Sequence, residues 1–141
     1  MKKVNDARQR NRNLELDIKL SLGDQKEIVV YGNSDRLRQV FDNLVSNAIR
    51  YTESGNVIIS AEIRDTEVEF TVSDTGMGMN SESTERIFER FFRTDDARKI
   101  FRGGTGLGLA ICKHIIEAHN SSLIVDSIEK EGSTFAFSLK C

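Results

Sequence analysis

The segment Gly103-Gly-Thr-Gly-Leu-Gly-Leu109, followed at once by the apolar run Ala110-Ile-Cys-Lys-His-Ile-Ile116, is the most informative stretch of this chain. Glycine has no Cβ and adopts positive φ freely, so backbone N–H groups in such a loop can close around an anion. A helix that begins directly behind the loop adds the positive end of its dipole. The stretch therefore favours a phosphate site, and a Gly-rich surface turn is the alternative interpretation.

Two further segments place polar or glycine residues in patterns that suit a nucleotide. In the helical pattern around Asn43-Leu-Val-Ser-Asn47, Asn43, Asn47 and Arg50 fall on one border of the apolar face. Amide oxygens suit Mg²⁺, although ordinary half-exposed asparagines are the alternative. Asp74-Thr-Gly-Met-Gly78 ends an apolar strand, where a carboxylate can accept a hydrogen bond from an exocyclic amine; a simple turn is the alternative. Together the three segments point to one nucleotide site.

Length and composition limit the classes of protein that fit. The 141 residues suit a single domain, 1–141, with a real core. With 20 basic and 22 acidic side chains the net charge is −2, so we expect no nucleic-acid partner. No apolar run is long enough for a bilayer, and no signal-peptide pattern is present. Cys112 and Cys141 show no metal or disulfide spacing, which fits a reducing cytosol.

The periodicity of the apolar residues predicts an α+β fold. Helices are expected over 3–13, Ser34–Thr52 with Ser34 as N-cap, Glu82–Phe92, and from the Gly-rich loop to about Asn120. Strands are expected over Leu14–Leu22, Glu27–Tyr31, Val57–Ile63, Val68–Ser73, Leu123–Ser127 and Thr134–Leu139. These elements predict a two-layer α/β sandwich, in which a mixed, mainly antiparallel sheet carries about three long helices on one face.

The motifs, in this order and spacing, resemble those of sensor histidine kinases. The matching segments are Asn43-Leu-Val-Ser-Asn-Ala-Ile-Arg-Tyr-Thr52 (N box), Asp74-Thr-Gly-Met-Gly-Met79 (G1 box), Ile87-Phe-Glu-Arg-Phe-Phe-Arg93 (F box), Gly103-Gly-Thr-Gly-Leu-Gly-Leu-Ala110 (G2 box) and Gly132-Ser-Thr-Phe135 (closing strand). The resemblance extends from Leu14 to Leu139. It implies the Bergerat ATP-binding fold, shared with gyrase-type and Hsp90-type ATPases, here as the catalytic ATP-binding domain of a kinase.

The resemblance also implies a role for each matching residue. Asp74 is expected to bind the adenine amino group, with Thr134 assisting through water, and Gly76 and Gly78 let the ring approach the backbone. The other residues expected around the ring are Tyr51, Ile87 and Phe135. Asn47 is expected to hold Mg²⁺.

The remaining assignments concern the phosphates and the transfer step. Asn43 is expected near the metal and the γ-phosphate, Arg50 stands where the family usually has Lys, and Arg93 is expected to reach the γ-phosphate or the acceptor. The residues expected to cap the phosphates are Gly104, Thr105, Gly106, Leu107, Gly108 and Leu109, and Arg93–Arg102 is expected to form most of a mobile lid.

Two departures from the family pattern are informative. Asn120-Ser121 replaces the usual Gly-Gly after the last helix, but Asn tolerates the left-handed conformation that ends a helix. No phosphoacceptor motif of the Ser-His-Glu-Leu-Arg kind is present, and His114 and His119 lack the acidic residue that follows the acceptor. We therefore expect ordinary helix roles for both histidines.

The function implied is that of a catalytic domain without its acceptor. It would bind Mg·ATP and pass the γ-phosphoryl group to a histidine on a separate dimerisation domain, and from there to an Asp of a response regulator. Gyrase-like members have Glu where this chain has Asn43, and an amide cannot serve as the general base for hydrolysis. We expect a monomeric cytoplasmic fragment with negligible turnover alone, whose parent is anchored at the inner face of the cell membrane. The alternatives are an anti-sigma-type protein-serine kinase and a non-catalytic nucleotide-sensing or docking module.

Overall fold

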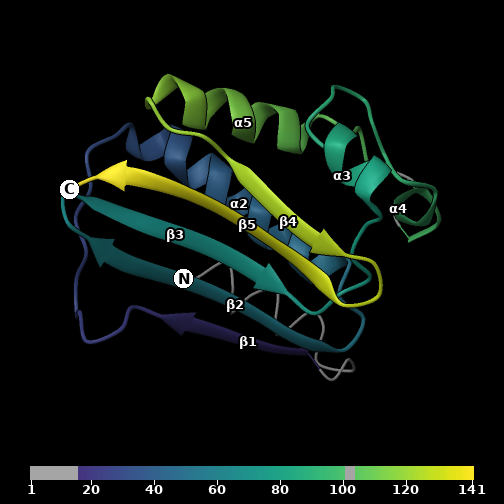
Figure 1. Ribbon diagram of the computed structural model, residues 1–141, viewed down its shortest axis with the longest axis horizontal. Coiled ribbons are helices and arrows are strands. Elements are labelled where there is room, and N and C mark those ends of the chain that lie inside the picture. The colour runs from purple at the N-terminus through teal and green to yellow at the C-terminus, as the bar shows by residue number, and fades with distance from the viewer. Residues whose placement is uncertain (1–15, 101–103) are drawn as a thin grey trace.

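The computed structural model describes residues 16–100 and 104–141, which form a sheet with helices on one face (Figure 1). The sheet has five strands in the order β1-β2-β3-β5-β4, antiparallel except that β1 runs parallel to β2. The strands are β1 (Leu16–Ser21), β2 (Gly55–Arg64), β3 (Glu67–Asp74), β4 (Ile124–Ile128) and β5 (Gly132–Lys140). The predicted α+β sandwich with a mixed, mainly antiparallel sheet is confirmed.

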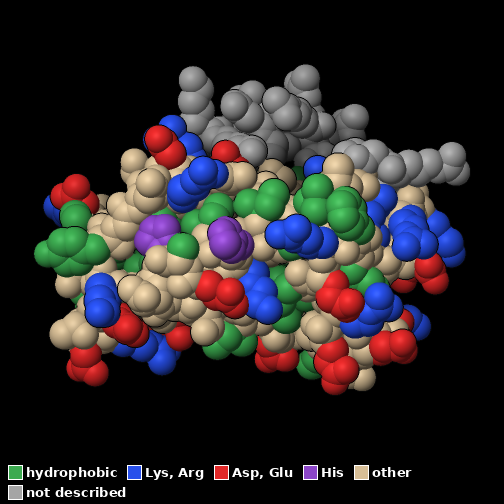
Figure 2. Space-filling view, turned by 90° about the horizontal axis from the view of Figure 1, so that it is seen from above, with side chains coloured by type: hydrophobic (Ala, Val, Ile, Leu, Met, Phe, Trp, Pro, Cys, Tyr) green, Lys and Arg blue, Asp and Glu red, His purple; other side chains and the backbone are tan. Residues whose placement is uncertain are grey.

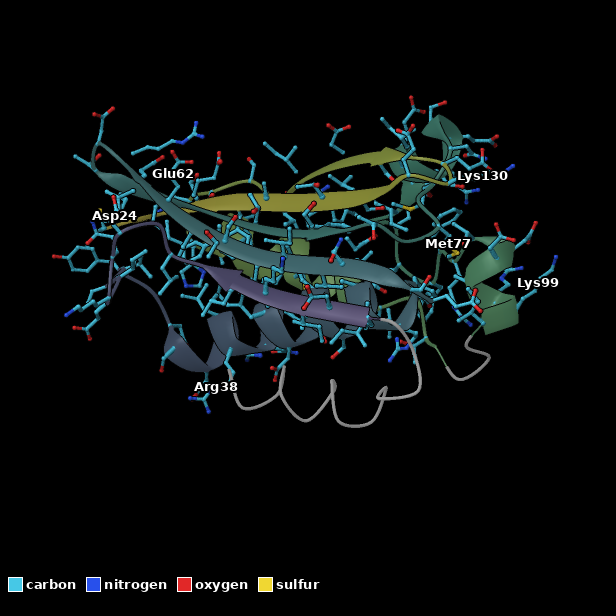
Figure 3. All side chains as sticks on the ribbon, turned by 90° about the horizontal axis from the view of Figure 1, so that it is seen from below. Asp24, Arg38, Glu62, Met77, Lys99 and Lys130 are labelled. Carbon is cyan, nitrogen blue, oxygen red and sulfur yellow. The ribbon has the colours of Figure 1, made fainter. Side chains whose placement is uncertain are left out.

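Two long helices form the second layer. They are α2 (Ser34–Arg50), with 17 residues, and α5 (Gly108–Ala118), with 11. Figure 3 shows α2 beneath the sheet with Arg38 directed away from it. The short helices α3 (Ser81–Arg86) and α4 (Asp95–Ile100) lie at the end of the sheet toward which β3 and β4 run (Figure 1). The prediction of about three long helices is wrong for the described residues, and the predicted helix over 3–13 lies outside them.

The stretch from 82 to 92 is helical only as far as Arg86. Beyond it, Phe91 adopts a φ of +66° and its N–H donates to the Gly106 carbonyl oxygen over 2.9 Å. A left-handed residue cannot continue an α-helix, so the predicted helix could not have extended through Phe91 to Phe92.

The core lies between the sheet and the two long helices. Because side chains alternate along a strand, one face of the sheet supplies apolar residues to the core, and the opposite face carries mostly polar ones. The largest fully buried apolar side chains of the core are Val40, Leu44, Val57, Val72, Cys112 and Ile116. On the open face, the hydroxyls of Ser73 and Thr134 are 2.8 Å apart and share a hydrogen bond.

Two details of the predicted elements are wrong. Residues 27–31 form no strand: Val29 and Tyr31 are 71% and 75% exposed, and Val30 alone of these three packs against the core. The N-cap of α2 is Asn33, whose side chain accepts from the Arg36 N–H over 3.1 Å, so Ser34 is already helical. The five observed strands otherwise agree with their predicted ranges to within two residues, apart from residues 14 and 15, which the structure does not describe.

Gly132→Ala should destabilise the fold more than Gly23→Ala, although both glycines have positive φ. A Cβ on Gly132 would lie 2.0 Å from the Asp74 carbonyl oxygen, whereas nothing lies within 4 Å of one on Gly23. We expect a loss of about 1 kcal/mol at Gly23 from the backbone conformation alone, and roughly 2 kcal/mol or more at Gly132, measured by urea unfolding. Equal losses would contradict the close packing assigned to the start of β5.

Candidate functional site

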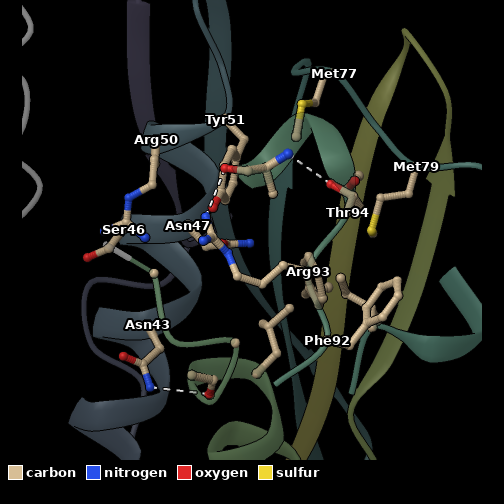
Figure 4. Close-up of a pocket in the computed structure, with 18 of the residues that line it drawn as sticks. Asn43, Ser46, Asn47, Arg50, Tyr51, Met77, Met79, Phe92, Arg93 and Thr94 are labelled. Atoms are coloured by element: carbon tan, nitrogen blue, oxygen red, sulfur yellow. Dashed lines mark hydrogen bonds between the residues drawn. The ribbon is translucent and has the colours of Figure 1, made fainter. Parts of the chain in front are cut away.

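A cavity of about 380 Å³ opens beside the C-terminal half of α2, in the size range of small-molecule sites (Figure 4). Its walls come from α2, the loop after β3, the segment from α3 to α4, the start of α5 and the start of β5. The lining residues are Asn43, Ser46, Asn47, Arg50, Tyr51, Asp74, Met77, Gly78, Met79, Ile87, Phe92, Arg93, Thr94, Ala97, Gly104, Thr105, Gly106, Gly108, Leu109, Ser133 and Phe135.

Asp74 occupies one end of this cavity, at the last position of β3. Its Oδ1 accepts hydrogen bonds from the Gly76 N–H over 2.9 Å and from the Ser133 N–H over 3.3 Å. Burial raises the pKa of the Asp74 carboxyl, and the two backbone hydrogen bonds offset part of this shift. The carboxylate is thus fixed through one oxygen, which leaves the other available to a ligand.

Apolar side chains surround the carboxylate. Met77 and Met79 come from the loop after β3, Phe92 precedes α4, and Phe135 lies on β5. Figure 3 shows Met77 at the same end of the molecule as Lys99 of α4, far from Asp24. A mostly apolar wall with one buried carboxylate suits a flat heteroaromatic ring that carries a hydrogen-bond donor.

The N-terminus of α5 forms the other end of the cavity. Asn33 and Asn80 cap α2 and α3 with their side chains, but Leu107 gives α5 no side-chain cap and its first turn holds no acidic residue. Gly108 and Leu109 of this first turn line the cavity. Free N–H groups and the positive end of a helix dipole favour a bound anion there.

The polar border of α2 faces the same space, as the sequence predicted. Asn43, Asn47 and Arg50 all line the cavity, together with Ser46. The Asn43 side chain donates through Nδ2 to the Gly108 carbonyl oxygen over 3.4 Å, which ties α2 to the start of α5 (Figure 4). Amide oxygens on this border are ligands that Mg²⁺ accepts when phosphate and water complete its shell.

The segment expected to form a lid is partly helical. Within it, Arg93 donates to the Ala97 carbonyl oxygen over 2.8 Å, and α4 runs from Asp95 to Ile100. A Cβ on Gly104 would lie 2.9 Å from the Arg93 guanidinium carbon, so this glycine permits the close contact. Residues 101–103, at the end of the expected lid, lie outside the described residues.

Most residues predicted for the site line the cavity, and three do not. Gly76 supports Asp74 through its N–H, and Leu107 precedes the first turn of α5. The role expected for Thr134 does not agree with its position. Phe135 points into the core, so its neighbour Thr134 must face the opposite side of the sheet, where its hydroxyl shares a hydrogen bond with that of Ser73. Ser133, which the prediction omitted, contacts Asp74 instead.

Other lining residues were missed as well. They are Ser46, Met77, Met79, Phe92, Thr94 and Ala97, in addition to Ser133. Strand alternation counted back from Phe135 would have found Ser133, and Ser46 lies beside Asn43 and Asn47 on the helix. Met77 and Met79 depend on the path of the loop after β3, and Phe92, Thr94 and Ala97 depend on how the segment from α3 to α4 folds over the cavity.

Neither histidine lies in the cavity. The His119 ring accepts at Nε2 from the Asn33 N–H over 3.0 Å, which joins the end of α5 to the start of α2, and Nδ1 is 2.7 Å from the Ile115 carbonyl oxygen within α5. His114 is exposed on α5. Figure 2, which looks onto the α5 side of the molecule, shows both histidines at the surface among interspersed acidic and basic side chains.

Residues 32–141 match the family described as histidine kinase-, DNA gyrase B- and HSP90-like ATPases. The chain belongs to this family. It is 45% identical over 118 residues to the signal transduction histidine-protein kinase BaeS of Escherichia coli and 40% identical over 117 residues to the sensor histidine kinase WalK of Bacillus subtilis. These matches cover 83% and 81% of this chain, but only 25% and 19% of the two relatives.

Solved structures of histidine kinases share the fold. The catalytic domain of ThkA has a TM-score of 0.79 at 30% identity, covering 99% of this chain and 92% of that one. Full-length ShkA in complex with AMPPNP also has a TM-score of 0.79, at 28% identity, covering 98% of this chain and 28% of ShkA. The chain is therefore the catalytic ATP-binding domain of a sensor histidine kinase. Within 16–100 and 104–141, no helix has the length and apolar character needed to cross a membrane.

Asp74→Asn should raise the melting temperature of the nucleotide-free domain at neutral pH while weakening adenine nucleotide binding. Because burial raises the pKa of Asp74, the folded state binds this proton more tightly than the unfolded state. At a pH above the raised pKa, the ionised Asp74 carboxylate therefore lowers the stability of the folded state. At a pH low enough to protonate Asp74 in both the folded and the unfolded state, this loss disappears. The gain in melting temperature should shrink as the pH falls toward acid values.

Calorimetry of Asp74→Asn and of Asp126→Asn, an exposed carboxylate on β4, checks this prediction. Asp126→Asn should leave the melting temperature almost unchanged. A loss of stability in Asp74→Asn at neutral pH, or a difference that does not depend on pH, would contradict the burial argument.

Proposed function

We propose that this domain binds Mg·ATP and donates the γ-phosphoryl group to a histidine on a separate dimerisation domain, from which the group passes to an Asp of a response regulator. The observation that supports this most strongly is the arrangement of one cavity, with a buried carboxylate at one end and an uncapped helix N-terminus at the other. We place the domain on the cytoplasmic side of a membrane-anchored parent protein.

At the base end, Asp74 selects an amine. Its Oδ1 is occupied by two backbone N–H groups, so its second oxygen can accept the exocyclic amine of adenine. Tyr51, Ile87 and Phe135 line the cavity around this position and suit the faces of the ring. A base that carries a carbonyl oxygen in place of the amine would place an acceptor against the carboxylate, and no hydrogen bond could form between them.

At the phosphate end, the chain supplies dipoles and positive charge. The first turn of α5 offers N–H groups, and Arg50 and Arg93 line the same cavity. Mg²⁺ neutralises phosphate charge when it is bound. In the described part of the chain, no group of three or more His, Cys, Asp or Glu side chains is placed to hold a metal ion, so Asn47, with Asn43 nearby, would hold the metal only together with phosphate oxygens.

The site favours transfer over hydrolysis. Among the described residues, Asp74 is the one carboxylate that lines the cavity, and it lies at the base end. Asn43 occupies the position where a general base would be needed, and an amide cannot take up a proton. The residues of this chain can thus position ATP and stabilise the charge that develops, while the nucleophile comes from the partner domain.

Two alternatives use the same cavity. An anti-sigma-type serine kinase would transfer phosphate to a serine of an antagonist protein, and a docking module would bind nucleotide without transfer. The complete F box and the relatives named as sensor histidine kinases favour the histidine kinase. The presence of Asn43, Asn47 and Arg93 in the cavity argues for transfer.

Asn47→Ala should remove the Mg²⁺ dependence of nucleotide binding and lower the affinity for Mg·AMPPNP about tenfold, because one metal ligand is lost. Isothermal titration with and without Mg²⁺ measures this. Asn56→Ala, an exposed asparagine on β2, is the matched control and should bind like the wild type. Absence of nucleotide binding by the wild type would overturn the proposed function.

Mixing the domain with labelled ATP and a dimeric helical fragment that carries the family's acceptor histidine should yield phosphohistidine, which is stable to alkali and lost in acid. Arg93→Ala should lower the transfer rate at least tenfold, because the developing charge loses a guanidinium partner. Phosphoserine on an added protein would support the serine kinase instead. Nucleotide binding with no transfer to any acceptor would support the docking module.

A further inference from the structure

The structure buries two polar side chains among the residues it describes, and both lie near Asp74. Thr52 is 1% exposed and Ser133 is 9% exposed. The Ser133 hydroxyl is 2.7 Å from the Ser127 hydroxyl and shares a hydrogen bond with it. The Thr52 hydroxyl has no hydrogen-bond partner within the described parts of the chain. A buried hydroxyl without a partner is unfavourable, so this one requires a physical explanation.

The surroundings of Thr52 indicate where its partner would lie. Thr52 follows Tyr51, the C-cap of α2, and lies beside the backbone of Gly76. A Cβ on Gly76 would be 2.8 Å from Thr52 Oγ1, 3.0 Å from Asp74 Oδ1 and 2.4 Å from the Tyr51 carbonyl oxygen. Three oxygens thus converge on one side of Gly76, and of these three groups the Thr52 hydroxyl carries a proton.

We propose that the Thr52 hydroxyl holds an ordered water that donates to the Asp74 carboxylate, which makes Thr52 a positioning residue for recognition of the base. The inference rests on the proposed function, because Asp74 matters for the base only if the cavity binds a nucleotide. Buried waters typically connect polar groups that the protein alone leaves unsatisfied. This water would be a further donor to Asp74, in addition to the N–H groups of Gly76 and Ser133.

A role of Thr52 in recognition of the base can be distinguished from a purely structural role by the choice of ligand. Thr52 does not line the cavity, so it acts on the ligand through Asp74. Loss of the water should therefore weaken ligands that carry the exocyclic amine and spare ligands that lack it. General damage to the cavity would weaken both kinds of ligand equally.

The test is isothermal titration of the chain with ADP and with purine riboside diphosphate, which has hydrogen in place of the amine. Thr52→Val removes the hydroxyl at nearly constant shape and should weaken ADP about tenfold, with purine riboside diphosphate unchanged. Thr52→Ser restores the hydroxyl and should bind ADP within about twofold of the wild type. Equal losses for both ligands, or no loss of ADP affinity, would overturn the proposal.

Wild-type behaviour distinguishes this failure from failure of the proposed function. A wild type that binds neither ligand, or that binds both equally well, refutes the role of Asp74 itself. If Thr52→Val does not fold, a high-resolution crystal structure of the wild type decides. It should show a water about 3 Å from both Thr52 Oγ1 and the Asp74 carboxylate. A hydroxyl bonded directly to a protein atom, with no such water, would overturn the proposal.

Discussion

The Asp74 carboxylate lies at the end of a strand where burial opposes its charge, and the surrounding backbone is arranged to support it. β3 and β5 pair so that Asp74 lies opposite Ser133, which brings the Ser133 N–H to Oδ1. Gly132 permits this approach, since a Cβ there would lie 2.0 Å from the Asp74 carbonyl oxygen. Gly76 supplies the second N–H in a position that leaves no room for a side chain. Stability is thus reduced at the point where we propose that the base is recognised.

The opposite end of the cavity depends on how the two long helices meet. Asn43 donates to Gly108 at the first turn of α5, and the buried Cys112 lies 3.8 Å from the Val40 carbonyl oxygen of α2. These contacts fix the uncapped end of α5 beside the polar border of α2. The Gly-rich loop is held from the other side, where the Gly106 carbonyl oxygen accepts from the Phe91 N–H. The positions proposed for the base and for the phosphates therefore belong to one connected frame, closed by the segment that contains α4.

Sequence motifs predicted the fold class and most of the cavity, because glycines, a strand-end carboxylate and spaced asparagines have few other uses in combination. The prediction for Thr134 was wrong because it used the position in the motif alone. It ignored strand alternation, which directs Thr134 to the face of the sheet opposite to that of Phe135. Residues 27–31 have the composition of a strand, yet most of their side chains face solvent. The early end of α3 and the isolation of the Thr52 hydroxyl arise from tertiary contacts that no local pattern encodes.

A crystal structure of the domain with Mg²⁺ and AMPPNP would locate both ends of the bound nucleotide at once, and so would test the cavity as the nucleotide site. We expect the adenine amine within hydrogen-bond distance of Asp74, the triphosphate at the N-terminus of α5 and the metal beside Asn47. A nucleotide bound outside this cavity, or one with its triphosphate directed away from α5, would contradict this expectation.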